Sequence, residues 1–548
     1  MRIALTGRWA ILGLSLVAGA ASALAFPPFG FLPGLLAYGG MMWLWDHADA
    51  DRPLRSAFWR GWLSGSVFFL ISTWWVYEAF QVDAANQGWM APIAVALLAA
   101  ILGLFWGVAA LAYRAIAAKG LLRVVVFAGV FCGLEWVRGH LFTGFPWDLP
   151  GEAWRAGSAP SQAASIFGAY GLSFITVAAS AALTLAADYR DRRALAGAGV
   201  GLAVVLSLYG FGAWRLAHVA PPLANAPIVR IIQPDEHEQP SYSADDFRAI
   251  VARYATLTSQ PAAKAPDVVI WPEGAIPAAA NDFLGPGSWT LPAIEAALKP
   301  GQSLMIGAYR VGGTEAAPLY YNTLVVSREG SAGLVLTATY DKYRLVPFGE
   351  YMPADSIMGR LGFKKLVHVG DGFSPGPRPT PIRPQGLPAV QPLICYEALF
   401  PGLPRGGSGP GDRAAWIVNV SDDAWFGRTY GPLQHLNLAS YRAIETGLPM
   451  ARATPTGVSA MVDAYGRIVP GASLPQGAMG VIDRPLPAAL PPTLFVRFGE
   501  IFFYGFIGLA VAAGLVLRRG AFLNPQLTLM LSSSMSRARG AAPARLRE

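Results

Sequence analysis

Three side chains with reactive groups stand at the ends of apolar, strand-like runs in the second half of the chain. Glu273 comes shortly after VVIW, Lys342 after LTATY and Cys395 after QPLI. Where strands lie parallel in a sheet, their carboxyl ends share one edge, and reactive residues gather there. We therefore expect Glu273, Lys342 and Cys395 to meet in one site.

In combination, these groups can carry out nucleophilic attack on a carbonyl carbon. Cys395 would be the nucleophile, because a thiol is already slightly ionised near neutral pH. Glu273 in WPEGAIP can take the thiol proton, and Lys342 supplies the positive charge that a thiolate and a developing oxyanion need. Glu350, in the same stretch as Lys342, can hold the lysine in place. With a base and an ammonium nearby, we expect a raised thiolate fraction on Cys395.

Each of these residues also has a plainer structural alternative. Cys395 could be a buried, inert thiol, Glu273 a loop carboxylate and Lys342 a solvated surface charge. Glu350 could be a turn residue. A cysteine–histidine pair with His435 in GPLQHLNLAS is the rival chemistry. We expect His435 to make a structural polar contact instead, because no third group that would orient it is recognisable nearby.

The composition of the chain indicates a membrane protein. Of 548 residues, 53% are hydrophobic and only 14% are charged. A helix that crosses the hydrocarbon needs about 20 mostly apolar residues. The two cysteines, Cys132 within an apolar run and Cys395 after a strand, are too differently placed to indicate a disulfide. We predict eight membrane-spanning helices, near residues 9–26, 30–46, 58–78, 90–113, 121–138, 163–187, 195–217 and 499–517.

Lysine and arginine gather in alternate loops, and this bias orients the predicted helices. It places both termini in the cytoplasm and the residues between the seventh and eighth helices outside, which in a bacterium means the periplasm. A cleavable signal peptide with AGAASALAF is the alternative for the first helix, and it would leave that domain on the same side. The basic residues predicted to face the cytoplasm are Arg2, Arg8, Arg52, Arg55, Arg60, Arg114, Lys119, Arg123, Arg190, Arg192, Arg193, Arg518, Arg519, Arg537, Arg539, Arg545 and Arg547.

Acidic residues in membrane spans can mark a transport path. Here Glu78 and Glu135 stand toward the ends of their spans, beside tryptophans. A transporter is therefore the weaker alternative from a different functional class.

The residues between the seventh and eighth helices predict a separate α/β domain. Residues 218–497 hold equal numbers of basic and acidic side chains, so the net charge of +8 belongs to the membrane part and indicates no nucleic-acid partner. Short apolar runs alternate there with candidate helices near 244–259, 291–299 and 431–447, which favours buried sheets covered by helices. We expect seven transmembrane helices in 1–217, the periplasmic domain in 218–497, the eighth helix in 498–518 and a cytoplasmic tail, disordered toward its end, in 519–548.

Several motifs together resemble a known family. WPEGAIP, DKYRLVPFGEYMP and LICYEALFP, in this order, resemble the Glu–Lys–Cys triad of the nitrilase superfamily. With FPPFG, TGFPW, NVSDDAWFG, GPLQHL and the predicted spans, they resemble the apolipoprotein N-acyltransferase family over nearly the whole chain. The resemblance implies an α+β membrane protein, with an eight-helix transmembrane bundle and a periplasmic αββα nitrilase-like sandwich. It implies that Glu273 is the base, Lys342 the stabiliser of the oxyanion and the thiolate, and Cys395 the nucleophile. It also implies supporting roles for Glu350, Tyr396 and Glu397.

The same resemblance implies a reaction. An acyl chain passes from the sn-1 position of a phospholipid, expected to be phosphatidylethanolamine, to a thioester on Cys395. The α-amine of a diacylglyceryl-cysteine at the N-terminus of an apolipoprotein then takes it. No metal or other cofactor is expected, and the enzyme is expected to be a monomer in the bacterial inner membrane. A membrane-anchored nitrilase-type amidase is the alternative enzyme.

The sequence departs from the family pattern at Asp235, Tyr242 and Asp422, where Asn, Trp and Asn are usual. These departures concern substrate contacts near Gln233 and Trp425. Because both implied substrates carry acyl chains, the site must open toward the bilayer. The apolar loop 352–376 is therefore expected to be a lid at the membrane surface, with ordinary packing on the domain as the alternative. The residues expected to contact lipid or substrate are Gln233, Phe363, Leu366, Trp425 and Phe426.

Overall fold

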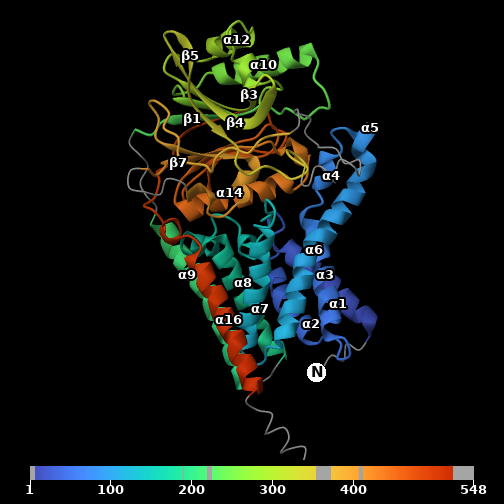
Figure 1. The fold of residues 1–548 in the computed structure, drawn as a ribbon. Coiled ribbons are helices and arrows are strands. Elements are labelled where there is room, and N and C mark those ends of the chain that lie inside the picture. Colours follow the sequence, from blue (N-terminus) through green and yellow to red (C-terminus); the bar gives the residue numbers. More distant parts are fainter. Residues whose placement is uncertain (1–6, 189–190, 219–224, 353–371, 406–411, 523–548) are drawn as a thin grey trace, which may run out of the picture.

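The molecule consists of a bundle of helices and a domain built on two sheets. In Figure 1 the helices occupy the lower half, and the two sheets with their own helices occupy the upper half. We call these parts the helix bundle (residues 8–217 and 501–522) and the sheet domain (residues 228–498). Phe363 and Leu366, and with them most of the expected lid, lie outside the described residues. The computed structural model describes residues 7–188, 191–218, 225–352, 372–405 and 412–522.

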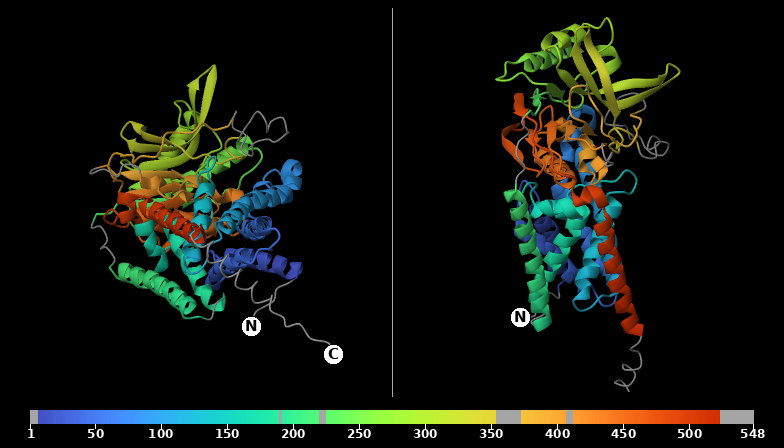
Figure 2. Two further views of the ribbon diagram at one scale, coloured as in Figure 1. Left: turned by 60° about the horizontal axis from the view of Figure 1, so that its bottom comes forward. Right: turned by 90° about the vertical axis from the view of Figure 1, so that its left-hand side faces the viewer.

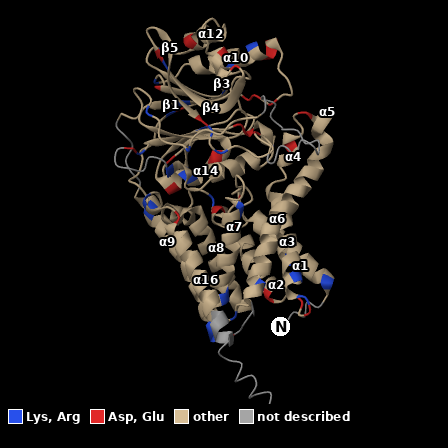
Figure 3. Ribbon diagram, in the orientation of Figure 1, with Lys and Arg blue, Asp and Glu red and all other residues tan. Residues whose placement is uncertain are grey.

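The helix bundle consists of apolar helices. Among the described residues, Ala84–Ile116, Pro160–Ala187 and Arg192–Ala217 are long and apolar enough to cross a membrane, and Arg8–Leu24 and Ile501–Val516 are shorter apolar helices. Figure 3 shows few charged residues along the middle of these helices. A helix lies in each of the eight predicted ranges, and the number that cross a membrane stays a prediction. These helices are α1 (Arg8–Leu24), α2 (Ala37–Asp46), α3 (Pro53–Ser72), α6 (Ala91–Ile116), α7 (Leu122–Arg138), α8 (Ala164–Asp188), α9 (Arg192–Ala217) and α16 (Ile501–Phe522).

Two sheets form the centre of the sheet domain. The six-stranded sheet has the order β11-β1-β2-β3-β4-β5, and the five-stranded sheet has the order β10-β9-β8-β7-β6. Strands β1, β2 and β3 are parallel, as are β6, β7 and β8, and the other neighbours pair antiparallel. The strands are β1 (Ile228–Gln233), β2 (Val268–Trp271), β3 (Ser303–Thr314), β4 (Ala317–Gly330), β5 (Gly333–Asp341), β6 (Val390–Ile394), β7 (Trp416–Val420), β8 (Met450–Ala453), β9 (Ser459–Val462), β10 (Ile468–Leu474) and β11 (Gly480–Pro485).

The sheets pack face to face, with helices on both outer faces. Buried side chains of β1 to β4 meet those of β6 to β9 in one core. Helices α10 (Ala244–Ser259) and α12 (Thr290–Ala297) cover the six-stranded sheet, and α14 (Gly431–Thr446) covers the five-stranded one. Figures 1 and 2 show the resulting layers. This order agrees with the αββα sandwich that the sequence led us to expect. The short helices are α4 (Val76–Ala79), α5 (Ala84–Gln87), α11 (Ala280–Phe283) and α15 (Leu494–Phe498).

Helix α14 lies between the five-stranded sheet and the helix bundle, and both of its faces are buried. One face packs on the sheet. The other faces the segment that joins α7 to α8: Asn437 Nδ2 donates to the carbonyl of Glu152 (3.0 Å), and the hydroxyl of Tyr441 donates to the carbonyl of Gly151 (2.8 Å). The polar residues of this helix, which a sequence pattern assigns to solvent, therefore serve as partners for the bundle.

A fully buried ion network joins α14 to the bundle. Arg442 lies 3.0 Å from Glu152 and 3.2 Å from Glu445, and all three side chains have no exposed surface. Glu445 also accepts the N–H of Ala169 in α8 (2.9 Å), and Arg442 donates to the carbonyl of Leu399 (3.0 Å). The single guanidinium of Arg442 thus lies between a carboxylate of the bundle and one of α14, and it ties the sheet domain to the bundle.

Replacing Arg442 with Met should destabilise the protein strongly, because two buried carboxylates lose their counter-ion. Breaking a buried ion pair from one side costs about 3–5 kcal/mol. Thermal unfolding of the purified protein in detergent measures the effect. The matched control is Arg248→Met, because the Arg248–Asp245 pair is exposed and contributes about 0–1 kcal/mol. Equal melting temperatures for the two variants would contradict this account of the joint.

Candidate active site

Cys395 stands in a strained turn directly after β6. It begins the 3-10 turn Cys395–Leu399, and its φ is +49°. This left-handed region costs a residue other than glycine about 1–2 kcal/mol, and such strain persists where the surrounding structure imposes it. Here Glu397 closes the turn, since its Oε2 accepts the N–H of Ile394 at 2.8 Å. The turn thereby places Cys395, a half-buried residue, at the tip of β6.

Glu397 also ties this turn to the loop that carries Lys342. Its side chain is fully buried, so its oxygens need partners within the protein. The donors to its Oε1 are the hydroxyl of Tyr340 (2.6 Å) and the N–H groups of Tyr343 (2.8 Å) and Arg344 (3.2 Å). Glu397 therefore fixes the turn of Cys395 and the loop of Lys342 relative to each other.

Four buried side chains form a closed set of hydrogen bonds at the strand ends. Lys342 Nζ donates to Oε1 of Glu273 (3.0 Å) and to Oε1 of Glu350 (2.9 Å). Asn322 Nδ2 donates to the same two oxygens, at 2.7 Å each. We call Glu273, Asn322, Lys342 and Glu350 the Lys342 cluster. The second oxygens of Glu273 and Glu350 accept N–H groups from Asp422 (2.7 Å) and Val346 (2.8 Å), respectively.

The Lys342 cluster keeps its lysine charged. Lys342 is only 1% exposed, and burial by itself would lower its pKa. Glu273 and Glu350, with a smaller effect of Cys395, outweigh burial and raise the pKa of Lys342 well above the ordinary value. The site therefore contains a permanent cation at a fixed place, which is what a developing oxyanion requires.

The thiol of Cys395 is within electrostatic reach of both Glu273 and Lys342. Burial and the charge of Glu273 raise the pKa of the thiol well above its ordinary value, against the opposite effects of Lys342 and a hydrogen bond with Ser421. The expectation of a raised thiolate fraction was therefore wrong. The sulfur rests as a neutral thiol because a buried carboxylate lies beside it, and that carboxylate can take the proton when the sulfur attacks.

A loop of the helix bundle reaches the site. The hydroxyl of Tyr396, next to Cys395, donates to the carbonyl of Gly144. Tyr351 and Arg344 in the sheet domain donate to Thr143, at 3.0 and 3.2 Å. The TGFPW segment noticed in the sequence thus borders the Cys395 turn, so the bundle positions one wall of the site.

His435 has an orienting partner that the sequence analysis did not recognise. Its Nδ1 lies 2.9 Å from Oδ1 of Asp423, whose carboxylate also binds Arg452. The other ring nitrogen faces the backbone carbonyl of Cys395 at 3.3 Å, not the sulfur. Burial and Arg452 lower the pKa of His435. The expectation that no third group orients His435 was therefore wrong. Its contact with the Cys395 turn is to the backbone carbonyl, as in a structural polar contact.

The residues expected to meet lipid divide into two kinds. Gln233 is fully buried. Its Nε2 donates to the carbonyls of Pro475 and Ala478, 2.8 Å each, and its Oε1 accepts the N–H of Ser459. Gln233 therefore joins strands and does not face substrate. Phe426, by contrast, is partly exposed, as is Trp425. Its ring centre lies 4.3 Å from that of Trp75, which places Phe426 against the bundle.

Sequence reasoning missed Asn322 and Ser421. Asn322 lies within β4 in YYNTLVV, where nothing marks it as different from any other strand residue. Ser421 follows β7, so its strand-end position was the available signal. Both were missed because their roles depend on partners far away in the sequence.

Replacing Glu273 with Gln should speed the alkylation of Cys395 by iodoacetamide at neutral pH. The substitution removes the charge that raises the thiol pKa, and each unit of decrease gives about tenfold more thiolate. Peptide mass spectrometry follows the rate at Cys395 separately from Cys132. Glu315→Gln, at an exposed hairpin, is the control for loss of a charge. Slower alkylation in Glu273→Gln would show that Glu273 does not hold the proton on the sulfur.

Comparisons with known proteins identify the family. Residues 18–182 match the model of the apolipoprotein N-acyltransferase N-terminal domain, and residues 229–490 match the carbon-nitrogen hydrolase model. The apolipoprotein N-acyltransferase of Caulobacter vibrioides is 53% identical over 93% of this chain and 95% of its own length, and that of Allorhizobium ampelinum is 36% identical over 95% and 98%. An amidase from Nesterenkonia sp. is 15% identical over 52% of this chain and 98% of its own, with a TM-score of 0.34, which carries no conclusion. The chain belongs to the apolipoprotein N-acyltransferase family.

Proposed function

We propose that this acyltransferase moves a fatty acyl chain from the sn-1 position of a phospholipid, through a thioester on Cys395, to the N-terminal amine of an apolipoprotein. Its family acts in lipoprotein maturation. The observation that carries the mechanism is the convergence of Glu273, Lys342 and Cys395 beside a loop of the helix bundle. Phosphatidylethanolamine is the proposed donor, and diacylglyceryl-cysteine the proposed acceptor.

In the first step, Cys395 replaces the alcohol of the ester. Glu273 takes the thiol proton as the sulfur attacks the ester carbonyl, so a free thiolate is not required beforehand. Lys342 stabilises the negative oxygen that forms. The carbon–oxygen bond then breaks, the proton passes from Glu273 to the leaving oxygen, and a lysophospholipid departs.

In the second step, the acceptor amine replaces the sulfur. A free α-amine has a pKa of about 7.7–8.0, so a large fraction is neutral near physiological pH. The amine attacks the thioester carbonyl, and Glu273 takes one amine proton. The carbon–sulfur bond breaks and Cys395 recovers its proton from Glu273. A thioester suits this step because it yields to an amine more readily than an oxygen ester does.

The membrane placement follows the charge pattern. We propose that eight helices cross the bacterial inner membrane, seven within 1–217 and one within 498–518. Both termini, including the tail 519–548, would lie in the cytoplasm, with the catalytic domain, 218–497, in the periplasm. Phe426 and Trp425, at the bundle side of the domain, are proposed to meet the acyl chains. The enzyme is proposed to act as a monomer.

A membrane-anchored amidase would use the same three residues, but it would have no need for the bundle at its active site. The hydrogen bonds from Tyr396 to Gly144 and from Tyr351 to Thr143 favour a site that works at the bundle. The nature of the adduct on Cys395 separates the two functions.

Incubation with phosphatidylethanolamine labelled in its sn-1 chain should leave the label on Cys395. The adduct should be released by hydroxylamine, because thioesters react with it readily, and it should be absent from Cys395→Ala. Mass spectrometry of the peptide locates the adduct. The chain should then pass to a diacylglyceryl-cysteine peptide in stoichiometric amount. A wild-type protein that acylates the peptide without any adduct on Cys395 would refute the thioester.

Replacing Asn322 with Leu should lower kcat/KM for acyl transfer about tenfold or more. The substitution keeps the size of the side chain but removes the donor shared by Glu273 and Glu350, and unpaired buried acceptors cost about 1–3 kcal/mol. Asn281→Leu is the control, because Asn281 bonds only the backbone of Val311 at an exposed position. Full turnover in Asn322→Leu would mean that the Lys342 cluster does not need this residue to hold its base.

A further inference from the structure

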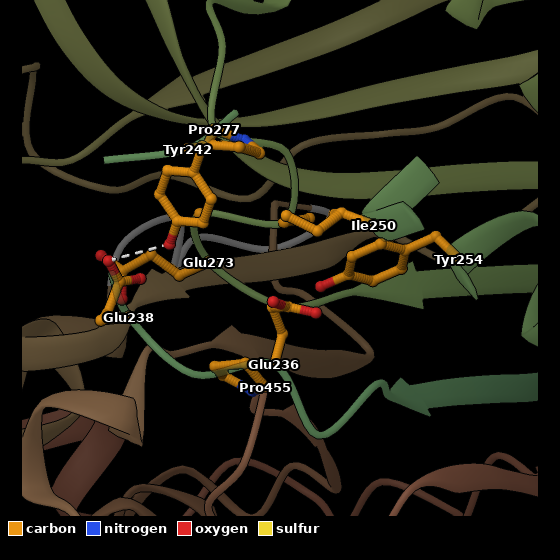
Figure 4. A pocket seen from close by; sticks show the side chains of 10 residues that line it. Glu236, Glu238, Tyr242, Ile250, Tyr254, Glu273, Pro277 and Pro455 are labelled. Atoms are coloured by element: carbon orange, nitrogen blue, oxygen red, sulfur yellow. Dashed lines mark hydrogen bonds between the residues drawn. The ribbon is translucent and has the colours of Figure 1, made fainter. Parts of the chain in front are cut away.

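A small cavity opens beside Glu273 on the side of α10. Carboxylates of Glu236, Glu238 and Glu273 line it, together with Tyr242 and Tyr254, as Figure 4 shows. The free space for the centre of a water-sized group is about 10 Å³, which is room for one water or one group of similar size. An acyl chain does not fit, but a small polar group does.

Tyr254 points an unused hydroxyl into this cavity. The residue is only 1% exposed, and its ring stacks on Trp271 with the centres 4.5 Å apart. Figure 4 shows its oxygen directed toward the space near Glu236. No hydrogen bond to this oxygen exists among the described residues. The oxygen of Tyr254 can therefore accept a hydrogen bond from a ligand in the cavity.

The carboxylates at the cavity are incompletely neutralised. Glu238 and Asp422 are joined by a side-chain hydrogen bond, so one of them holds a proton; burial raises the pKa of Glu238, and that of Asp422 more strongly. Tyr242 donates weakly to Glu238 at 3.4 Å. The permanent cations nearby are Arg253, paired with Glu236, and Lys342, shared by Glu273 and Glu350, and His237 also acts on Glu236. Even when Glu238 and Asp422 share one proton, the negative carboxylates around the cavity outnumber the cations. The cavity therefore favours a positively charged ligand.

That ligand is better matched by an ammonium than by a metal ion. Within the described residues, no group of three or more His, Cys, Asp or Glu side chains is arranged to hold a metal. A primary ammonium has three donors and no acceptor. It could donate to Glu236, Glu238 and the hydroxyl of Tyr254, which are acceptors on three sides of the space.

We propose that this cavity binds a primary ammonium group, which places an amine directly beside Glu273. The proposal rests on the proposed function, in which two molecules carry such a group: the apolipoprotein through its N-terminal amine, and phosphatidylethanolamine through its head group. Glu273 lines the same cavity, so an acceptor amine held there stands next to the base that must take its proton. Of the departures from the family pattern, Tyr242 lines this cavity, and Asp422 bonds Glu238, which lines it.

Two conservative variants test the cavity in the full-length protein. Tyr254→Phe removes only the hydroxyl and keeps the ring on Trp271, and Glu238→Gln removes the charge but can still bond Asp422. The matched controls are Tyr309→Phe and Glu315→Gln, which lie outside the cavity. Acyl-enzyme formation is measured with phosphatidylethanolamine and with phosphatidylglycerol, and its discharge is measured separately with a diacylglyceryl-cysteine dipeptide.

If the cavity receives the acceptor, both variants should lower kcat/KM of the discharge step about tenfold, with acyl-enzyme formation unchanged. If it receives the donor head group, formation should fall with phosphatidylethanolamine and not with phosphatidylglycerol. Either result supports the proposal. Unchanged rates in both steps, or equal losses in every step, would overturn it, because neither outcome depends on an ammonium.

A binding test without turnover separates this proposal from the proposed function. Methylammonium chloride should raise the melting temperature of Cys395→Ala relative to the same concentration of tetramethylammonium chloride, which is too large for the cavity. Adding Glu238→Gln should abolish the difference. A wild-type protein that forms no thioester would refute the mechanism alone, whereas equal effects of the two salts would refute the ammonium site.

Discussion

A buried lysine held between two carboxylates is the interaction on which the rest of the structure depends. Charges removed from water are tolerated only when they are paired and hydrogen-bonded. Lys342 meets this condition through Glu273 and Glu350, and Asn322 completes it by bonding both carboxylates. These residues come from the ends of β2 and β5, from β4 and from the following loop. All of these strands belong to the six-stranded sheet, whereas Cys395 follows β6 of the five-stranded sheet, so the site draws on both layers of strands. Burial and Glu273 raise the pKa of the Cys395 thiol, against the opposite effect of Lys342.

The helix bundle contributes to the same site. Tyr396 binds Gly144, and the network around Arg442 fixes α14 against the segment that carries Glu152. The turn that begins at Cys395 and helix α14 are therefore both attached to the segment between α7 and α8. The part of the chain that matches the carbon-nitrogen hydrolase model thus shares its candidate active site with a loop of the helix bundle.

The sequence allowed the meeting of Glu273, Lys342 and Cys395 and most of the fold to be predicted, because these depend on local signals. The helix at 244–259 begins with a capping box, in which Ser243 and Asp246 bond each other's backbone, and the structure has the same boundaries. What depends on distant partners was missed: Asn322 in a strand, the Asp423 partner of His435 and the bridging role of Gln233. The spans are harder to count, because α3 and α7 contain charges. Arg60 and Arg123 are paired with Asp49 and Asp46 in neighbouring segments, which hydropathy cannot register.

The central claim is that Cys395 rests as a neutral thiol beside a charged carboxylate–lysine pair. Infrared spectroscopy measures this most directly, since a thiol has an S–H stretching band and a thiolate has none. The difference between wild type and Cys395→Ala removes the contribution of Cys132. The account predicts that this difference contains an S–H band at neutral pH, and that the band disappears once a phospholipid has acylated the protein. A difference spectrum without an S–H band in the resting enzyme would show that the sulfur is already ionised, and it would contradict the account.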